Sequence, residues 1–172
     1  MVTRTDFNRY MMPTYKPANF IPLKAKGSIV WDKKNKKYID FASGIAVSNL
    51  GHCHPILNKA LVEQSKKIWH LSNLLVNEPA MRLAKIFCKH TFAEKVFFAN
   101  SGAEAVEGAI KTARKHAYEN ISKKKSEIVS FSDAFHGRTM MAIALNGSDR
   151  FVKGFGPMPS GIKNHPFNET KN

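Results

Sequence analysis

The sequence predicts an α/β fold with a mostly parallel sheet. From residue 51 onward, short apolar segments alternate with segments whose apolar residues recur at helical spacing. Segments 95–99 (KVFFA) and 127–131 (EIVSF) flank one such helical segment, with short joints on either side. This order of strand, helix and strand is typical of a crossover between parallel strands. Because a stable parallel sheet needs more strands than these, we expect part of a larger domain.

The N-terminal part of the chain predicts an arm, a hairpin and two helices. The first 25 residues carry several prolines and little periodicity, so we expect an extended arm. Residues 27–44 alternate apolar and polar side chains around a Lys/Asn turn, which predicts a β-hairpin. Pro55 and Pro79 each precede apolar residues at helical spacing, and proline favours the first turn of a helix.

The C-terminal part predicts a helix after each of the two strands. The first helix starts near residue 101, and its apolar stripe consists of Ala103, Val106, Ile110, Ala113 and Ala117. Segment 138–145 is predicted to be another helical stretch. The last 25 residues contain three prolines and are predicted to form a loop.

Composition excludes several functional classes. No apolar run reaches the roughly 18 residues of a membrane span, and residues 1–9 lack a signal-peptide core. Cys53 and Cys88 are too few for a disulfide framework, which favours a cytoplasmic protein. The net charge of +14 is scattered, and its clusters at 33–37 and 123–125 lie in expected turns without stacking aromatics. We therefore expect neither a membrane nor a nucleic acid as partner.

The densest group of metal-ligating residue types is the sequence GHCHP, with His52, Cys53 and His54 in succession. Adjacent side chains rarely converge on one metal ion, and no other Cys/His pair has zinc-site spacing. We expect no metal site here, but a turn that leads into the helix at Pro55.

The sequence NSGAE, after segment 95–99, has two interpretations. Ser101 and Glu104 have the spacing of a capping box, which accounts for a helix start. Gly102 in the first turn favours close approach of a ligand to the backbone, and the turn follows the carboxyl end of a predicted strand. The amides of Gly102 and Ala103 would suit a phosphate at the helix N-terminus. A cap alone and a phosphate site both remain open at this point.

The sequence SDAFHGRT (132–139) leaves the end of the second predicted strand and would lie beside the first turn. Phe135 could cover a flat heterocycle, and the guanidinium of Arg138 could hold a carboxylate through two hydrogen bonds. A phosphate site, a stacking ring and a carboxylate-binding cation together indicate a phosphorylated aromatic cofactor and an acidic substrate.

These motifs resemble a known family. FFANSGAEAVEGAIKTAR (97–114) and FSDAFHGRT (131–139) are similar to segments of the class III pyridoxal-phosphate-dependent aminotransferases. Segments 38–55 (YIDFASGIAVSNLGHCHP) and 69–84 (WHLSNLLVNEPAMRLA) are most similar to the acetylornithine aminotransferases of arginine biosynthesis. The resemblance implies the fold-type-I transferase architecture, a homodimer, and transfer of an amino group from N-acetylornithine to 2-oxoglutarate.

The resemblance also implies roles for individual residues. Gly102 and Ala103 would bind the phosphate of pyridoxal 5'-phosphate through their amides, with Ser101 assisting. Phe135 would stack on the pyridine ring, and Arg138 would bind the substrate carboxylate. Segment 73–76 (NLLV) departs from the aromatic-containing form of the family, so ornithine and succinylornithine stay open as amino donors.

The family's Schiff-base lysine, and the aspartate that pairs with the pyridine nitrogen, belong to motifs that do not occur in these 172 residues. We therefore assign no catalytic residue here and expect an N-terminal portion that is inactive alone. Residues 1–50 would be an arm and hairpin of a small domain, and residues 51–172 the first part of the large domain. The alternative is a non-enzymatic basic fragment that binds nucleic acid or a partner chain.

Overall fold

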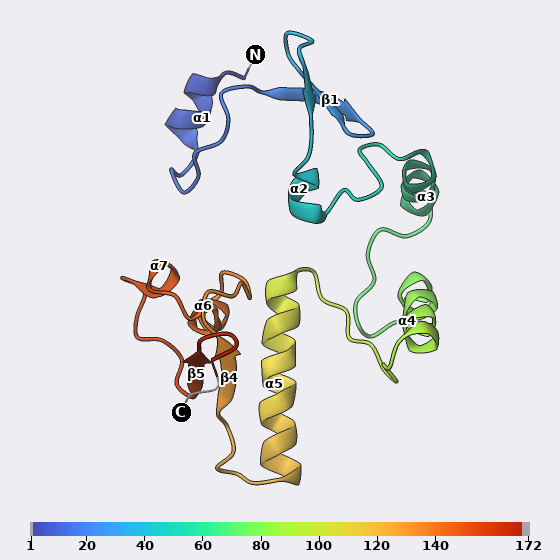
Figure 1. Ribbon diagram of the computed structural model, residues 1–172. Helices are drawn as coiled ribbons and strands as arrows, with labels where there is room; N and C mark the ends of the chain where they lie inside the picture. The colour runs from blue at the N-terminus through green and yellow to red at the C-terminus, as the bar shows by residue number, and fades with distance from the viewer. Residues whose placement is uncertain (1, 170–172) are drawn as a thin grey trace. The chain divides into compact units, whose positions relative to one another are not determined.

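The computed structural model describes residues 2–169 and divides into two compact units (Figure 1). The first unit spans Met1–Val76 and the second Asn77–Asn172. Each unit has its own sheet, and the two are described separately below.

The first unit opens with a short helix, α1 (Arg4–Tyr10), where we had predicted only an extended arm. That prediction was wrong because Thr3 and Asp6 form a capping box. The Thr3 hydroxyl accepts from the Asp6 amide at 3.2 Å, and the Asp6 carboxylate accepts from the Thr3 amide at 2.8 Å. Two initial amides are thereby satisfied, which offsets the cost of starting a seven-residue helix.

A three-stranded antiparallel sheet follows, in the order β1 (Pro22–Lys26), β2 (Ile29–Asp32) and β3 (Lys37–Ile39). The predicted hairpin is confirmed as β2 and β3, with Val30 opposite Tyr38. Asp32 shapes the turn, since its carboxylate accepts from the amides of Lys34 and Lys36 at 2.8 and 2.9 Å. The third strand, β1, lies within the segment that we had predicted to be an extended arm.

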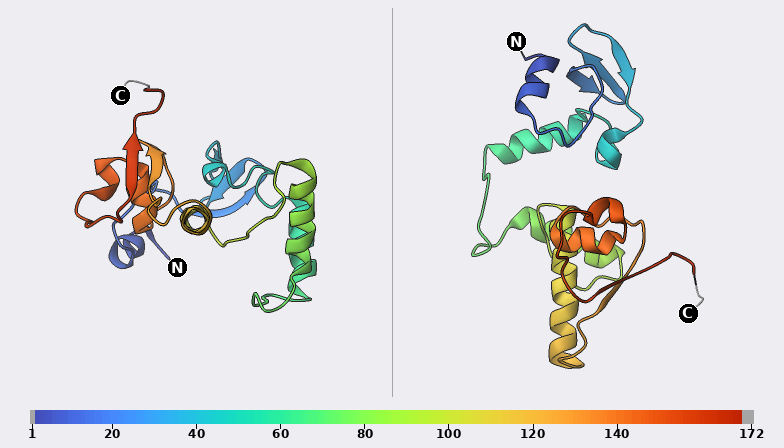
Figure 2. Two further views of the ribbon diagram at one scale, coloured as in Figure 1. Left: turned by 90° about the horizontal axis from the view of Figure 1, so that it is seen from below. Right: turned by 90° about the vertical axis from the view of Figure 1, so that its left-hand side faces the viewer.

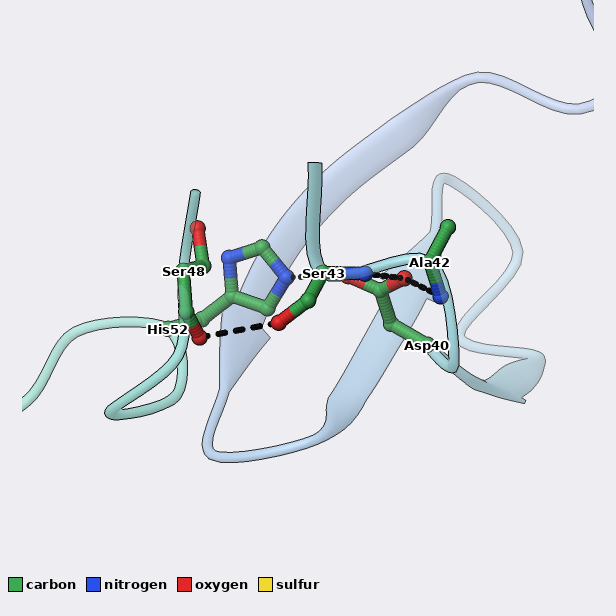
Figure 3. Close-up of polar contacts among 5 residues, drawn as sticks. All are labelled: Asp40, Ala42, Ser43, Ser48 and His52. Carbon is green, nitrogen blue, oxygen red and sulfur yellow. Dashed lines mark hydrogen bonds and ion pairs between the residues drawn. The ribbon is translucent and has the colours of Figure 1, made fainter. Parts of the chain in front are cut away.

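After β3 the chain makes a left-handed turn, α2 (Ser43–Ala46), in which four successive residues have positive φ. Only one of the four is glycine, so the turn carries backbone strain that neighbouring contacts must offset. Asp40 supplies them: its Oδ1 accepts from the amides of Ala42 and Ser43, and its Oδ2 from His52 Nε2 at 2.7 Å (Figure 3). The Ser43 hydroxyl donates to the Ser48 carbonyl at 2.9 Å.

The helices predicted at Pro55 and Pro79 are both confirmed. They are α3 (Pro55–Ser65) in the first unit and α4 (Glu78–His90) in the second, each with proline in its first turn. In α4 the Asn77 side chain caps the helix by accepting from the Ala80 amide at 3.1 Å. No residue of either helix is buried among the described residues, so their apolar stripes remain accessible.

The second unit centres on a parallel pair of strands, β4 (Ile128–Phe131) and β5 (Ile162–His165). They are joined through the helices α6 (Met140–Asn146) and α7 (Asp149–Val152). The predictions of β4 and α6 are confirmed, but the last 25 residues are not the loop we expected, since they contain α7 and β5.

Segment 95–99 is not a strand in the structure, which corrects the first strand of our predicted crossover. An apolar segment becomes a strand only where a neighbour completes its hydrogen-bond ladder, and no described strand pairs with it. The parallel pair therefore comes from β4 and β5 instead.

The predicted helix after this segment is α5 (Gly102–Asn120), which packs against α6 (Figures 1 and 2). Arg114 attaches it to both strand entrances, because its guanidinium donates to the carbonyls of Ser126 at 3.0 Å and Ser160 at 2.8 Å. Within residues 2–169, the buried apolar residues are few and belong to one element: Ala142, Ile143, Ala144 and Leu145 of α6. Helix α6 is thus the core of the second unit.

Candidate functional site

The first turn of α5 forms one side of the candidate site. The Ser101 hydroxyl accepts from the Glu104 amide at 3.2 Å, as the capping box predicts. The Glu104 carboxylate reaches one residue further than expected and accepts from the Asn100 amide at 2.6 Å. Within residues 2–169, no hydrogen bond uses the amides of Gly102 and Ala103. The helix start is therefore held in shape while two of its donors stay available.

Gly102 lies in open space. A Cβ added to this residue would meet no atom within 4 Å, so packing inside the described residues does not require glycine here. Because an alanine would favour the helix more, the open side of Gly102 fits a ligand that approaches the backbone closely.

The turn after β4 packs directly against this helix start. A Cβ on Gly137 would lie 2.8 Å from the Ala103 Cβ, and Gly137 has φ +127. The Thr139 hydroxyl donates to the Glu107 carboxylate of α5 at 2.6 Å. The structure thus brings together the two motifs, NSGAE and SDAFHGRT, that the sequence placed side by side.

Phe135 and Arg138 lie on either side of this contact. Phe135 is 66% exposed, and its ring meets the ring of Phe151 from α7 edge-on, with centroids 6.4 Å apart. This edge contact leaves ring surface accessible for stacking. Arg138 is exposed and immediately precedes Thr139, the residue that caps α6.

The Asn146 side chain holds the backbone of His136 and Gly137, which lie between Phe135 and Arg138 in the sequence. Its Oδ1 accepts from the His136 amide at 2.6 Å, and its Nδ2 donates to the Gly137 carbonyl at 3.3 Å. The ring atom Nε2 of His136 is buried and has no hydrogen-bond partner among the described residues.

Sequence reasoning missed three supporting residues: Glu107, Asn146 and Phe151. Glu107 was hidden by its place on a helix rich in charges, and Phe151 by its place in a predicted loop. An asparagine at a helix end usually indicates only that the helix stops. Nothing in the sequence therefore indicated that the Asn146 side chain bonds to the amide of His136, ten residues earlier. The distances became visible only with the fold.

The arrangement fits pyridoxal phosphate. The phosphate is an anion, and the two available amides at the positive end of a 19-residue helix are suitable donors for it. The accessible ring of Phe135 suits the pyridine, and the Arg138 guanidinium suits a carboxylate. Ser101 stands next to the two amides and could add a hydroxyl donor.

The GHCHP turn belongs to the first unit. Among the described residues, no group of three His, Cys, Asp or Glu side chains is arranged to hold a metal ion. His52 is instead the partner of Asp40, and its backbone exchanges hydrogen bonds of 2.9 and 2.8 Å with Gly27. Likewise, no helix within residues 2–169 is long and apolar enough to cross a membrane.

A helix start with two available amides, packed against a turn that carries an aromatic ring and a cation, is the arrangement expected of the pyridoxal-phosphate-dependent α/β transferases. The chain belongs to the class-III aminotransferase family, whose sequence model, "Aminotransferase class-III", matches residues 10–172. Proteins of this family are pyridoxal-phosphate-dependent enzymes.

Curated relatives agree with this membership. The chain is 52% identical over 169 residues to the acetylornithine/succinyldiaminopimelate aminotransferase of Buchnera aphidicola subsp. Acyrthosiphon pisum, covering 98% of this chain and 41% of the relative. It is also 52% identical over 168 residues to the succinylornithine transaminase/acetylornithine aminotransferase of Pseudomonas aeruginosa, covering 98% and 41%. The chain therefore spans about two fifths of the length of these relatives.

Solved structures show the same fold. The ornithine aminotransferase of Toxoplasma gondii ME49 superposes with a TM-score of 0.90 at 27% identity, covering 96% of this chain and 39% of that one. The N-acetylornithine aminotransferase of Stenotrophomonas maltophilia K279a gives a TM-score of 0.73 at 33% identity, covering 96% and 38%. The α/β fold predicted from the sequence, that of fold-type-I transferases, is thereby confirmed.

Proposed function

We propose that these residues form the phosphate- and ring-binding side of a pyridoxal phosphate site in an aminotransferase that acts on N-acetylornithine and 2-oxoglutarate. The observation that carries the proposal is the contact between Gly137 and Ala103, where an added Cβ would lie 2.8 Å from its neighbour. Through this contact, the turn that carries the ring and the cation packs against the helix start that carries the free amides.

Each residue has a distinct task. The amides of Gly102 and Ala103, with the Ser101 hydroxyl, bind the phosphate; Phe135 covers one face of the ring. Arg138 binds the carboxylate of the amino acid or oxo acid. When bound, pyridoxal phosphate supplies a carbonyl carbon that accepts the amino group and a ring that withdraws electrons from the reacting carbon. By excluding water from one face and fixing the phosphate, these residues orient the ring.

The names of the relatives support the choice of amino donor. Their names include acetylornithine and succinylornithine enzymes, which share a donor with an amino group at one end and a carboxylate near the other. We propose N-acetylornithine, with succinylornithine and ornithine as the closest competitors. Comparison of kcat/KM for the three donors in the protein expressed from its natural gene decides among them.

The wider setting is also proposed. We infer a cytoplasmic homodimer: the two free cysteines fit a reducing compartment, and the resemblance to the class III aminotransferases implies the homodimer. Residues 1–50 would contribute to the small domain and residues 51–172 to the large domain of the whole protein. We assign the lysine that carries the cofactor to none of the lysines in these residues, so we expect the chain alone to be inactive.

The experiment uses two variants of the protein expressed from its natural gene. Gly102→Val should fold normally, because its side chain enters open space, yet weaken pyridoxal phosphate binding about tenfold or more by obstructing the amides. Arg138→Ala should raise KM for carboxylate substrates with little change in cofactor affinity. Unchanged cofactor affinity in Gly102→Val would remove the helix start from the site, and unchanged KM in Arg138→Ala would remove Arg138.

A further inference from the structure

Asn146 is a polar side chain in an apolar place. It is 0% exposed and ends the helix whose preceding four residues form the apolar core. Burying an amide is costly unless both its ends form hydrogen bonds. Here both ends do, and both bonds go to backbone groups of the loop after β4 rather than to the helix itself.

The two bonds meet at adjacent residues. The His136 amide and the Gly137 carbonyl are the groups held, and they lie between Phe135 and Arg138. Gly137 has φ +127 and no side chain to restrict its rotation, so the direction in which the chain leaves it depends on external contacts. The Asn146 amide fixes that direction at two points.

The end of α6, which carries Asn146, is itself held by hydrogen bonds to the sheet. Asn164 of β5 donates to the carbonyls of Ala144 and Leu145 at 3.2 and 3.3 Å and to the Ser130 hydroxyl at 2.7 Å. The last turn of α6 is thereby attached to both strands. The sheet therefore fixes the end of α6, and Asn146 at that end fixes the loop that carries Phe135 and Arg138.

We infer that Asn146 is a positioning residue for the cofactor ring and the substrate carboxylate. It acts through the His136–Gly137 backbone, which sets where the Phe135 ring and the Arg138 guanidinium lie, and it touches neither ligand. This inference rests on the proposed function. An apolar side chain of similar size would fill the same space but leave the His136 amide and the Gly137 carbonyl unpaired.

The test substitutes Asn146→Asp in the protein expressed from its natural gene. The aspartate keeps an acceptor for the His136 amide, but at neutral pH it directs a carboxylate oxygen at the Gly137 carbonyl. Burial raises the pKa of such a carboxyl, and when protonated it again donates a hydrogen bond there. We therefore expect KM for the carboxylate substrate and Kd for pyridoxal phosphate to rise about tenfold at pH 8 and to recover toward pH 6.

Two comparisons isolate positioning from loss of stability. Wild type is measured over the same pH range as a reference, since His136 lies beside the substitution. Ile143→Ala removes core volume from the same helix but no hydrogen-bonding side chain, so it should lower the melting temperature but leave KM and Kd unchanged. Amide hydrogen exchange at His136, followed by NMR on the cofactor-free protein, should accelerate in Asn146→Asp and not in Ile143→Ala.

The outcomes distinguish a positioning role of Asn146 from a role in the fold alone. Unchanged KM, Kd and His136 exchange in Asn146→Asp at pH 8 overturn the positioning role while leaving the proposed function intact. If that variant does not fold, Asn146→Ser, which introduces no charge, should show the same rise in KM and Kd. Failure of both variants to fold, with Ile143→Ala folded, makes Asn146 a residue of the fold alone. A wild-type protein that binds no pyridoxal phosphate overturns the proposed function as well.

Discussion

At the scale of single residues, Gly137 has the tightest surroundings in the candidate site. An added Cβ would lie 2.8 Å from the Ala103 Cβ and 3.1 Å from the Ala142 Cβ, and neither methyl group can rotate away. We expect Gly137→Ala to lower the free energy of unfolding by about 2–4 kcal/mol, through the clash and the positive φ together. Urea denaturation of the protein expressed from its natural gene measures the change.

Gly154→Ala is the matched control for this substitution. Gly154 also has a positive φ, of +85°, but nothing lies within 4 Å of its Cβ position. It should cost only about 1 kcal/mol, from backbone strain. Equal losses in the two variants would show that the contact between the loop and α5 is not close in solution.

Asp40 makes the stability of the fold depend on pH. The imidazole of His52, followed by the amide of Ser43, lowers the pKa of Asp40 below its ordinary value. The unfolded chain therefore binds the proton first as the pH falls. The pair stabilises the fold above about pH 4, and this stability is lost on acidification through the lower folded pKa.

Replacing Asp40 by Asn removes this contribution. We expect the variant to unfold in less urea than wild type at pH 6 and the difference to shrink as the pH approaches 2. His52→Gln, which keeps a neutral donor, should show an intermediate slope. A difference between Asp40→Asn and wild type that is constant from pH 6 to pH 2 would contradict the linkage.

At the scale of elements, local signals decided which predictions succeeded. Pro55, Pro79 and the Ser101 cap identified α3, α4 and α5, because proline and capping residues act within one turn. Helix α1 was missed although its capping box is equally local, since the prolines of the arm dominated the interpretation. In each case the outcome depended on whether the signals in the first turn of the helix were recognised.

Strands were harder, because pairing is not local. The apolar segment 95–99 has no partner in the described residues, whereas the polar segment IKNH became β5 by pairing with β4. The site followed the same division. Ser101, Phe135 and Arg138 could be proposed from their motifs, while Asn146 and Glu107 act across ten and 32 residues of chain.

Arg114 attaches helix α5 to the sheet through hydrogen bonds. Arg114 donates to the carbonyls of Ser126 and Ser160 at both strand entrances. Because a charged donor is lost and carbonyls are left unpaired, Arg114→Ala should cost about 2–3 kcal/mol of unfolding free energy. Thermal and urea denaturation of the variant measure this loss.

Lys115, the next residue along α5, supplies the control. It pairs with Glu119 at 2.6 Å while remaining 69% exposed, so Lys115→Ala should cost less than about 0.5 kcal/mol. If both variants lost the same stability, the loss in Arg114→Ala would not come from the attachment to the strands.

At the scale of the whole molecule, the dominant feature is accessible apolar surface. The chain exposes 15158 Å², whereas a folded monomer of this length exposes about 8,500 Å², and two separate domains of these sizes about 10,000 Å². Side chains that normally form a core are among the exposed ones, including Phe92, Phe97 and Trp69. The hydrophobic stabilisation available to the chain is correspondingly small.

We therefore expect the 172-residue chain, expressed by itself, to bind the dye ANS strongly and to unfold gradually in urea. Apolar surface of this extent binds the dye, and a core of four small or medium side chains gives little cooperativity. A relative of full length should bind little dye and unfold sharply under the same conditions. Weak dye binding, a sharp transition and measurable aminotransfer by the 172-residue chain would each contradict this expectation. The first two would show that its apolar faces are covered, and the third that it needs no lysine from elsewhere.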